Sequence, residues 1–295
     1  MSLFYIVILA VVQGLAELLP VSSSAHVIVI AKLLGLDPSK PEMTLLLVML
    51  HTGTMFAVIL YFWRAWKRSI FASRTVFRQQ AVRLLIATML TAAVGVPLIL
   101  GIEKGAEKFG YLVKDASGHL PKAEIELLFG NLGCVAVALA VAGVLILTAG
   151  LAEQATAHGR PVGIREAAWI GAVQGLCLPF RGFSRSGATI STGLLLGTLK
   201  ARVEEFSFAL AVIITPAAIG REVWRLVKAH REAGNFDVTW NLFGPSLLGM
   251  VCAFLAGLLA LKWLSGWLEG GRWYLFGIYC LVAASAVFAL YCYGY

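Results

Sequence analysis

The chain has 295 residues, of which 59% are hydrophobic and only 14% charged, with a formal net charge of +8. A soluble domain has about 45–50% apolar and roughly 25% charged residues, so the composition predicts an integral membrane protein. The basic residues stand between apolar runs, where topology signals and anionic lipid headgroups account for them. No basic, aromatic-studded domain is present to bind nucleic acid.

The first residues lack a basic segment and a clear cleavage site, which favours mature sequence over a signal peptide. The five cysteines all lie in or beside apolar segments. They show no CxxC or Cys/His metal spacing, so we interpret them as buried thiols.

The apolar runs at the start of the chain, 3–19 and 21–36, are short, and Pro20 and three serines separate them. A short helix, a polar break and a second short helix are typical of a re-entrant hairpin. Irregular backbone at membrane depth needs protein or a water-filled cavity around it. Runs 167–178 and 187–199, split by PFRGFSRS, predict a second hairpin of the same kind.

Six longer runs are long enough to cross a bilayer, which takes about 20 residues. They are 43–63, 83–102, 128–151, 205–226, 243–264 and 273–293. Each half of a single membrane domain, 1–151 and 152–295, then holds one hairpin and three spans. Because three spans separate the hairpins, the second enters from the opposite face. The prediction is an all-α integral membrane protein with an inverted-topology repeat, whose hairpins meet near the midplane.

The hairpins themselves are related in sequence. AVVQGLAELLPVSSSAH (10–26) and GAVQGLCLPFRGFSRSG (171–187) align without a gap, which indicates two related halves. Segment 63–83 is rich in Arg and Lys with no acid and is predicted to be cytoplasmic, whereas 103–127 mixes acids with lysines and is predicted to be external. The second half fits this orientation less well, because four basic residues fall on its expected outer side: Arg221, Arg225, Lys228 and Arg231.

The first hairpin holds a carboxylate in an apolar helix. Gln13 and Glu17 are four residues apart and project from one helix face. An ionised Glu17 is costly there without a partner, so we interpret it as a metal ligand or a general acid/base. A neutral Glu17 that makes a structural hydrogen bond is the alternative.

Serines and a histidine follow. One of Ser22, Ser23 and Ser24 is expected to cap the next helix. His26 comes three residues after Ser23, so both can point into one cavity, and His26 is then a candidate base or nucleophile. A packing histidine with one hydrogen bond is the alternative. His51, in the next span, is a weaker candidate for the same cavity.

The second hairpin combines glycines, hydroxyls and a guanidinium. These residues are Gly182, Ser184, Arg185, Ser186, Gly187 and Thr189. Glycines let the backbone approach a ligand, hydroxyls donate, and the following helix presents free N–H groups. Arg185 adds a bidentate fork for phosphate oxygens. The pattern predicts an anion cradle; a loop that binds lipid headgroups loosely is the alternative. Glu205 is expected to cap the next helix rather than face the cavity.

QGLAELLPVSS with His26, followed by GFSRSGAT and EFSFALAV, resembles the bacterial undecaprenyl-diphosphate phosphatases of the bacitracin-resistance type. The resemblance covers nearly the whole chain. It implies hydrolysis of a C55 polyprenyl diphosphate to the monophosphate carrier lipid for cell-wall synthesis, in the bacterial cytoplasmic (inner) membrane. It also implies a divalent cation, Mg or Ca, and a site open to the external face. A homodimer is one candidate assembly.

Carried over by position, the family's first motif falls on Gln13 and Glu17, with Ser23 and His26 after it, and Ser22 is expected to contact the substrate. The second falls on Gly182, Ser184, Arg185, Ser186 and Thr189. Gln13 stands where the family allows Glu or Gln, so this chain has one carboxylate fewer at the site. Metal binding at that position is therefore expected to be weaker or indirect. Arg181 stands where a proline is expected, which adds a charge near the phosphates.

Our hypothesis for the mechanism is phosphoryl transfer by positioning and charge neutralisation. Arg185 and the hairpin N–H groups hold the diphosphate, and a cation near Glu17 neutralises developing charge. Ser23 or His26 attacks the terminal phosphorus, or Glu17 activates a water to do so; the sequence does not choose between them. A lipid flippase or secondary transporter is the rival function, since such proteins share the inverted-repeat architecture.

Overall fold

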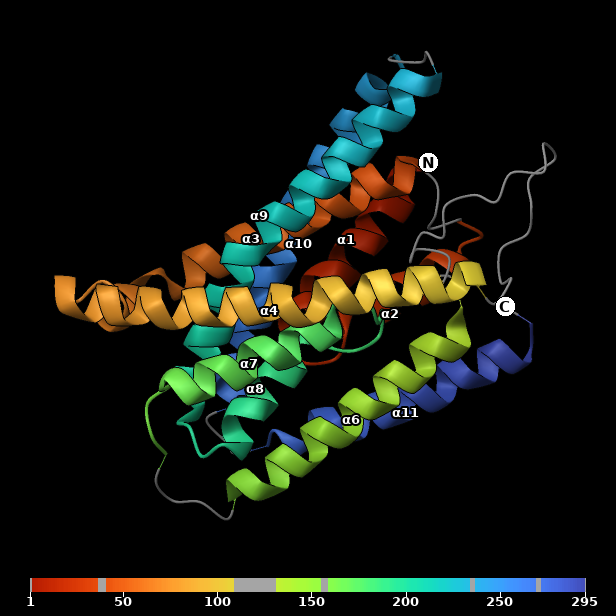
Figure 1. The fold of residues 1–295 in the computed structure, drawn as a ribbon. Coiled ribbons are helices and arrows are strands. Elements are labelled where there is room, and N and C mark those ends of the chain that lie inside the picture. Colours follow the sequence, from red (N-terminus) through yellow and green to blue (C-terminus); the bar gives the residue numbers. More distant parts are fainter. Residues whose placement is uncertain are drawn as a thin grey trace.

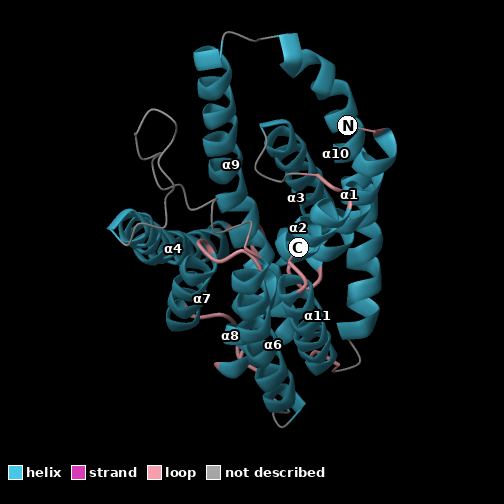
Figure 2. Ribbon diagram, turned by 90° about the vertical axis from the view of Figure 1, so that its right-hand side faces the viewer, coloured by secondary structure: helices cyan, strands magenta, loops and turns pink. Residues whose placement is uncertain are grey.

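The computed structural model describes residues 2–36, 41–108, 131–154, 159–233, 237–268 and 272–294. These ranges form helices joined by short loops (Figures 1 and 2), and their one strand-like pairing is an isolated bridge between Arg160 and Thr198. The helices are α1 (Leu3–Leu18), α2 (Ser23–Leu33), α3 (Pro41–Ser69), α4 (Arg74–Lys108), α6 (Leu132–Gln154), α7 (Ile164–Cys177), α8 (Arg185–Leu195), α9 (Lys200–Ala233), α10 (Asp237–Leu268) and α11 (Tyr274–Cys292).

Within the described part of the chain, five helices are long and apolar enough to cross a membrane. Their candidate spans are Leu45–Ser69, Arg74–Gly105, Leu132–Ala152, Phe243–Trp263 and Tyr274–Cys292. The all-α multi-pass architecture expected from composition is therefore confirmed. The sixth expected span, 205–226, lies within α9, whose side chains are described only in part, and it stays a prediction.

The expected orientation also stays a prediction, because residues 109–127 of the external segment lie outside the described residues. So do the side chains of the four basic residues Arg221, Arg225, Lys228 and Arg231.

Each of the two hairpins consists of short helices, as the polar breaks predict. α1 and α2 have 16 and 11 residues, and α7 and α8 have 14 and 11. Ser22 caps α2, accepting from the Ala25 N–H at 3.4 Å, and its own backbone lies in the left-handed region with φ of +67°. Ser184 caps α8, accepting from the Gly187 N–H at 3.1 Å. One of the three serines was expected to be a cap, and it is Ser22.

The turn of the second hairpin requires glycine at position 182. Gly182 has φ of +103°, which L side chains rarely adopt. A Cβ there would also lie 2.5 Å from the Val135 carbonyl oxygen, on α6. The tight turn and close backbone approach predicted for this glycine are therefore present, and the group that the backbone approaches is the Val135 backbone of α6.

Small residues allow the hairpins to pack closely on long helices, as is common between membrane helices. A Cβ on Gly14 of α1 would lie 2.6 Å from the Ala256 Cβ of α10. A Cβ on Gly175 of α7 would lie 2.8 Å from the Thr91 carbonyl oxygen of α4. In each hairpin the first helix therefore packs closely against one long helix: α1 against α10, and α7 against α4.

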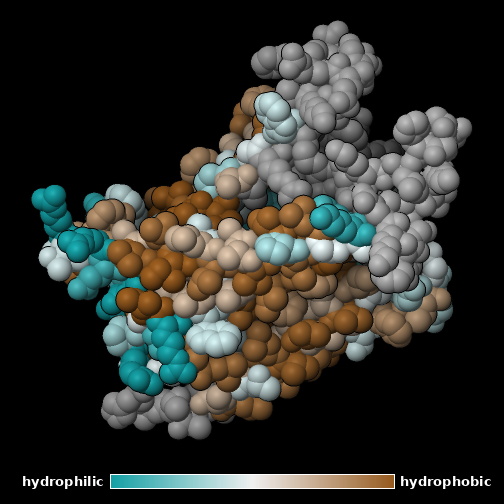
Figure 3. Space-filling model, viewed as in Figure 1, coloured by the Kyte–Doolittle hydropathy of each residue, from teal (hydrophilic) through white to brown (hydrophobic). Residues whose placement is uncertain are grey.

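The outer surface is largely apolar where the long helices run (Figure 3). On the face shown, hydrophilic side chains gather near helix ends: where α3 and α4 meet, near the start of α7 and at the other end of α4. This distribution suits helices surrounded by lipid with their ends in the headgroup region.

Candidate active site

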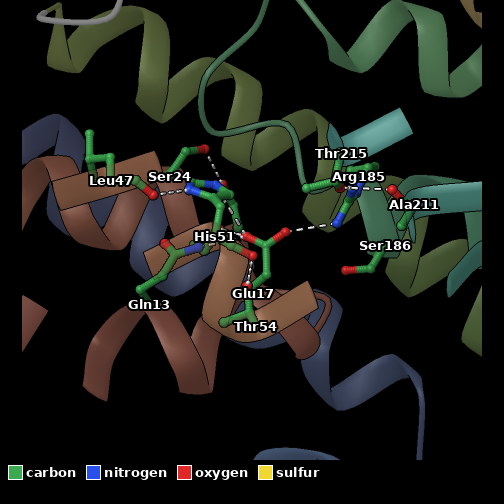
Figure 4. Close-up of polar contacts among 12 residues, drawn as sticks. Gln13, Glu17, Ser24, Leu47, His51, Thr54, Arg185, Ser186, Ala211 and Thr215 are labelled. Atoms are coloured by element: carbon green, nitrogen blue, oxygen red, sulfur yellow. Dashed lines mark hydrogen bonds and ion pairs between the residues drawn. The ribbon is translucent and has the colours of Figure 1, made fainter. Parts of the chain in front are cut away.

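The site is centred on Glu17, in the last turn of α1 (Figure 4). The Oε2 atom of Glu17 accepts a hydrogen bond from the Ser23 hydroxyl at 2.5 Å and from the Gln13 amide nitrogen at 3.0 Å. Its Oε1 atom accepts from Nη2 of Arg185 at 2.7 Å. The side chain of Glu17 is only 13% exposed, so these donors replace much of the water that an ionised carboxylate requires.

The pair of Glu17 and Arg185 joins the two hairpins, because Glu17 ends α1 and Arg185 begins α8. Two further bonds join the same segments: Ser186 Oγ donates to the Leu19 carbonyl at 3.3 Å, and the Gly182 N–H donates to Ser24 Oγ at 3.3 Å. The breaks in the two hairpins therefore meet inside the protein, which is the surrounding that irregular backbone at membrane depth requires.

Arg185 is held by α9 as well as by Glu17. Its Nη1 atom lies 3.5 Å from Oγ1 of Thr215, and that hydroxyl donates to the Ala211 carbonyl at 2.7 Å. The Arg185 side chain is 26% exposed. It keeps part of its surface available to a ligand while its direction is set from two sides.

His51 of α3 faces Glu17 from a third helix (Figure 4). Its Nε2 atom lies 3.7 Å from Glu17 Oε2, and its Nδ1 atom lies 2.8 Å from the Leu47 carbonyl oxygen. A carbonyl oxygen only accepts, so Nδ1 carries a proton and the ring orientation is fixed. The sequence pattern favours His26 over His51, because helix spacing alone does not show which face of α3 meets α1.

The structure places His26 in a different environment. Its Nδ1 atom lies 2.7 Å from the Ser22 carbonyl, and its Nε2 atom lies 2.7 Å from the Tyr279 hydroxyl of α11. The two rings are stacked, with centroids 5.7 Å apart and an angle of 9°. Ser23 therefore contacts Glu17 whereas both ring nitrogens of His26 have partners elsewhere.

The hydroxyls of the second hairpin mostly bond within the protein. Thr189 Oγ1 lies 2.6 Å from Ser207 Oγ and donates to the Arg185 carbonyl at 2.8 Å. Ser184 caps α8. These bonds fix the backbone that carries Arg185, and they leave Arg185 as the group of this hairpin that reaches the pocket.

A small pocket lies beside this cluster, with a volume of about 20 Å³, which accommodates one water molecule or little more. It is lined by Glu17, Leu18, His51, Thr54, Met55, Val58, Arg185, Ala211, Val212 and Thr215. Sequence reasoning missed Thr54 and Thr215. Pocket-facing positions on α3 and α9 follow from how the long helices pack, and no local motif marks them.

The site contains few groups that could bind a metal ion. The described residues contain no group of three His, Cys, Asp or Glu side chains that could hold a metal ion by themselves. Gln13 Oε1 is buried and has no hydrogen-bond partner among them. One carboxylate and one amide oxygen fit Mg²⁺ or Ca²⁺, because Mg²⁺ in particular is usually bound through one or two carboxylates together with substrate phosphates.

The fold and the site together define a multi-pass all-α membrane protein whose polar pocket is built where two short helical hairpins meet. The family model of the bacitracin resistance protein BacA matches residues 6–286 of the chain. The chain therefore belongs to the BacA family.

Individual relatives agree with this assignment. A protein of Acinetobacter baylyi named undecaprenyl-diphosphatase 2 is 54% identical over 98% of this chain and 98% of its own length. A protein of Anaeromyxobacter sp. named undecaprenyl-diphosphatase is 33% identical over 97% of this chain and 87% of its own. A protein of Thermus thermophilus with the same name is 32% identical over 96% and 95%.

Proposed function

We propose that this chain is a membrane phosphatase that hydrolyses undecaprenyl diphosphate to the monophosphate and inorganic phosphate, which recycles the carrier lipid of cell-wall synthesis. Membership of the BacA family and the names of its relatives support this function over a flippase or transporter. The observation that carries it is the meeting of Arg185 from one hairpin with Glu17 and Ser23 from the other. A guanidinium, a base and a hydroxyl are what phosphoryl transfer to a serine needs.

The geometry supports Ser23 as the nucleophile and Glu17 as its base. The Ser23 hydroxyl already donates to Glu17 Oε2, so Glu17 takes the proton as Ser23 Oγ bonds to the terminal phosphorus. The bond from that phosphorus to the bridging oxygen breaks, and the lipid monophosphate leaves. Water then attacks the phosphoserine and releases inorganic phosphate. Direct attack by a water molecule that Glu17 activates is the competing mechanism.

In this proposal Arg185 releases the Glu17 carboxylate and binds the terminal phosphate of the substrate in its place. The pocket has room for about one water molecule while Arg185 contacts Glu17. The substrate's terminal phosphate therefore enters as Arg185 turns from Glu17 Oε1 towards the phosphate oxygens, guided by Thr215. This exchange frees Glu17 to accept the Ser23 proton at the moment when a phosphate is present.

We further propose that a divalent cation is held by Glu17 and Gln13 Oε1 together with the phosphates, where it would neutralise negative charge on the diphosphate. Gln13 Nε2 and Ser23 keep Glu17 oriented for this arrangement. His51, fixed by its bond to Leu47, adds a third group against the same carboxylate.

We propose an inverted-topology repeat, with halves 1–151 and 152–295, in the bacterial inner membrane and with the pocket open to the external face. The related sequences of α1 and α7 support this, as does the packing of Gly14 against α10 and of Gly175 against α4. A homodimer is one candidate assembly of this chain.

The test is phosphate release from undecaprenyl diphosphate by purified protein in detergent, which abolishes transport but not hydrolysis. Ser23→Ala is expected to abolish release. Ser285→Ala, at an exposed position of α11 where the hydroxyl donates to the Leu281 carbonyl of the same helix, retains it. Wild type quenched with acid during turnover should carry phosphoserine. Absence of release by wild type contradicts the phosphatase, and release without phosphoserine in any variant favours the activated water.

A further inference from the structure

A second site of interaction lies at the turn between α3 and α4, at one of the helix ends where hydrophilic residues gather (Figure 3). Three aromatic rings are exposed there, with Trp63 at 46%, Phe71 at 50% and Phe77 at 46%. We call these rings and the exposed cations Arg64, Lys67 and Arg68 the α3–α4 patch.

The rings of the patch contact one another in a row. The centroids of Trp63 and Phe71 are 6.0 Å apart, and those of Phe71 and Phe77 are 5.6 Å apart and stacked. The Lys67 ammonium lies 5.3 Å from the Trp63 ring centroid, which is a cation–π distance. The patch therefore presents flat apolar rings with positive charge directly beside them.

The backbone under the patch is anchored. Trp66 is 5% exposed, and its indole N–H donates to the Glu205 carbonyl of α9 at 3.1 Å. The Ile70 and Phe71 N–H groups both donate to the Trp66 carbonyl, at 2.8 and 2.9 Å. The rings are thus held outward by a fixed turn, which lowers the entropic cost of binding a ligand on them.

The position of the patch relative to the candidate spans indicates what kind of ligand it binds. The candidate spans Leu45–Ser69 and Arg74–Gly105 lie on either side of the turn, so the turn is at the membrane surface, at headgroup depth. Segment 63–83 contains six basic residues and no acid. Tryptophan rings favour this depth, and basic clusters beside spanning helices attract anionic lipids.

We propose that the α3–α4 patch binds the phosphate headgroups of anionic phospholipids. Arg64 and Lys67 supply charge to the phosphate, Arg being able to do so with two parallel hydrogen bonds. Trp63 and Phe71 lie against the glycerol and upper acyl carbons. This proposal is independent of the phosphatase reaction, because none of these residues lines the pocket around Glu17.

The test compares binding of phosphatidylglycerol and phosphatidylcholine to the purified full chain in neutral detergent, by native mass spectrometry. Wild type is expected to prefer phosphatidylglycerol. R64Q/K67Q should lower that preference by about fivefold for each cation removed. Trp63→Leu should weaken the binding of both lipids alike, because the ring contacts carbons that they share. The matched control R160Q/R165Q removes two exposed cations outside the patch and should change it less than about twofold.

Thermal unfolding of each variant in the same detergent keeps folding defects apart from binding defects. The proposal is overturned if phosphatidylcholine binds wild type as tightly as phosphatidylglycerol, since the patch is then an apolar surface only. It is also overturned if the two double variants lose the preference equally, since net charge rather than this patch then attracts the lipid.

Discussion

Among single residues, the two histidines of the first half differ most from what their sequence positions indicate. His26 stands in the motif, yet its ring nitrogens contact Ser22 and Tyr279. His51 stands in an ordinary apolar helix, yet its Nε2 faces Glu17. The histidine nearest to Glu17 therefore comes from α3, and helix packing rather than proximity in sequence to Ser23 places it there.

Substitution separates these two histidines. His51→Leu should lower kcat for phosphate release by roughly tenfold to a hundredfold, because a carboxylate that loses one of its contacts no longer holds the reacting groups in place. His26→Phe keeps a ring stacked on Tyr279 and should cost less than about threefold, well below the range expected for a lost acid–base group. If His26→Phe lowers kcat in steady-state kinetics more than His51→Leu does, His26 is the catalytic histidine.

Gln13 and Gln174 occupy equivalent places in the two aligned segments, 10–26 and 171–187, but differ in their partners. Gln13 donates to Glu17, whereas the position that matches Glu17 in the second half is Leu178. Gln174 is 1% exposed, and neither of its amide atoms has a hydrogen-bond partner among the described residues. A buried, unsatisfied amide costs about 1–3 kcal/mol.

Gln174→Met, of similar length, should therefore raise the free energy of unfolding by about 1 kcal/mol or more and leave phosphate release unchanged. Gln13→Met removes a donor from Glu17 and should reduce phosphate release. Thermal unfolding in detergent and the release assay measure both effects. A lower melting temperature for Gln174→Met would show that the amide has a partner, such as a buried water.

Among the helices, the two hairpins were predictable because polar breaks, proline and glycine mark them in the sequence. The contact between Gln13 and Glu17 followed from helix spacing, and the N-cap from three consecutive serines. The places of Thr215, His51 and Tyr279 did not follow, because they depend on which faces of α9, α3 and α11 pack inward. Long helices that are apolar all round carry no signal for that choice.

The close packing of α1 against α10 predicts that a larger residue at Gly14 lowers stability. Gly14→Ala places a methyl group 2.6 Å from the Ala256 Cβ and 2.7 Å from the Ala253 carbonyl oxygen, and overpacking of this kind costs about 1–3 kcal/mol. Gly101→Ala in α4 meets no atom within 4 Å and should be neutral or stabilising, since alanine favours helix. Equal melting temperatures for the two variants would contradict the close approach of α1 and α10.

For the whole molecule, the proposed inverted repeat fixes which ends share a side of the membrane. It places the α3–α4 turn in the cytoplasm and the end of α11 outside. Thiol labelling of spheroplasts tests this with two single-cysteine proteins. The first keeps only Cys292. The second has no native cysteine and carries Ala72→Cys, at an exposed position of the turn. A membrane-impermeant thiol reagent should label Cys292 directly and the Ala72→Cys protein only after permeabilisation. Labelling of both from outside would exclude this topology.

The joining of the two hairpins through Arg185 and Glu17 is central to the proposed reaction. It is tested most directly by phosphate release from undecaprenyl diphosphate in detergent, for Arg185→Ala against the exposed control Arg165→Ala. Removing a positioned cation from a phosphate site should lower kcat/KM by about a hundredfold to a thousandfold, whereas the control retains wild-type activity. If Arg185→Ala releases phosphate as fast as wild type, the hairpin junction is not the catalytic site.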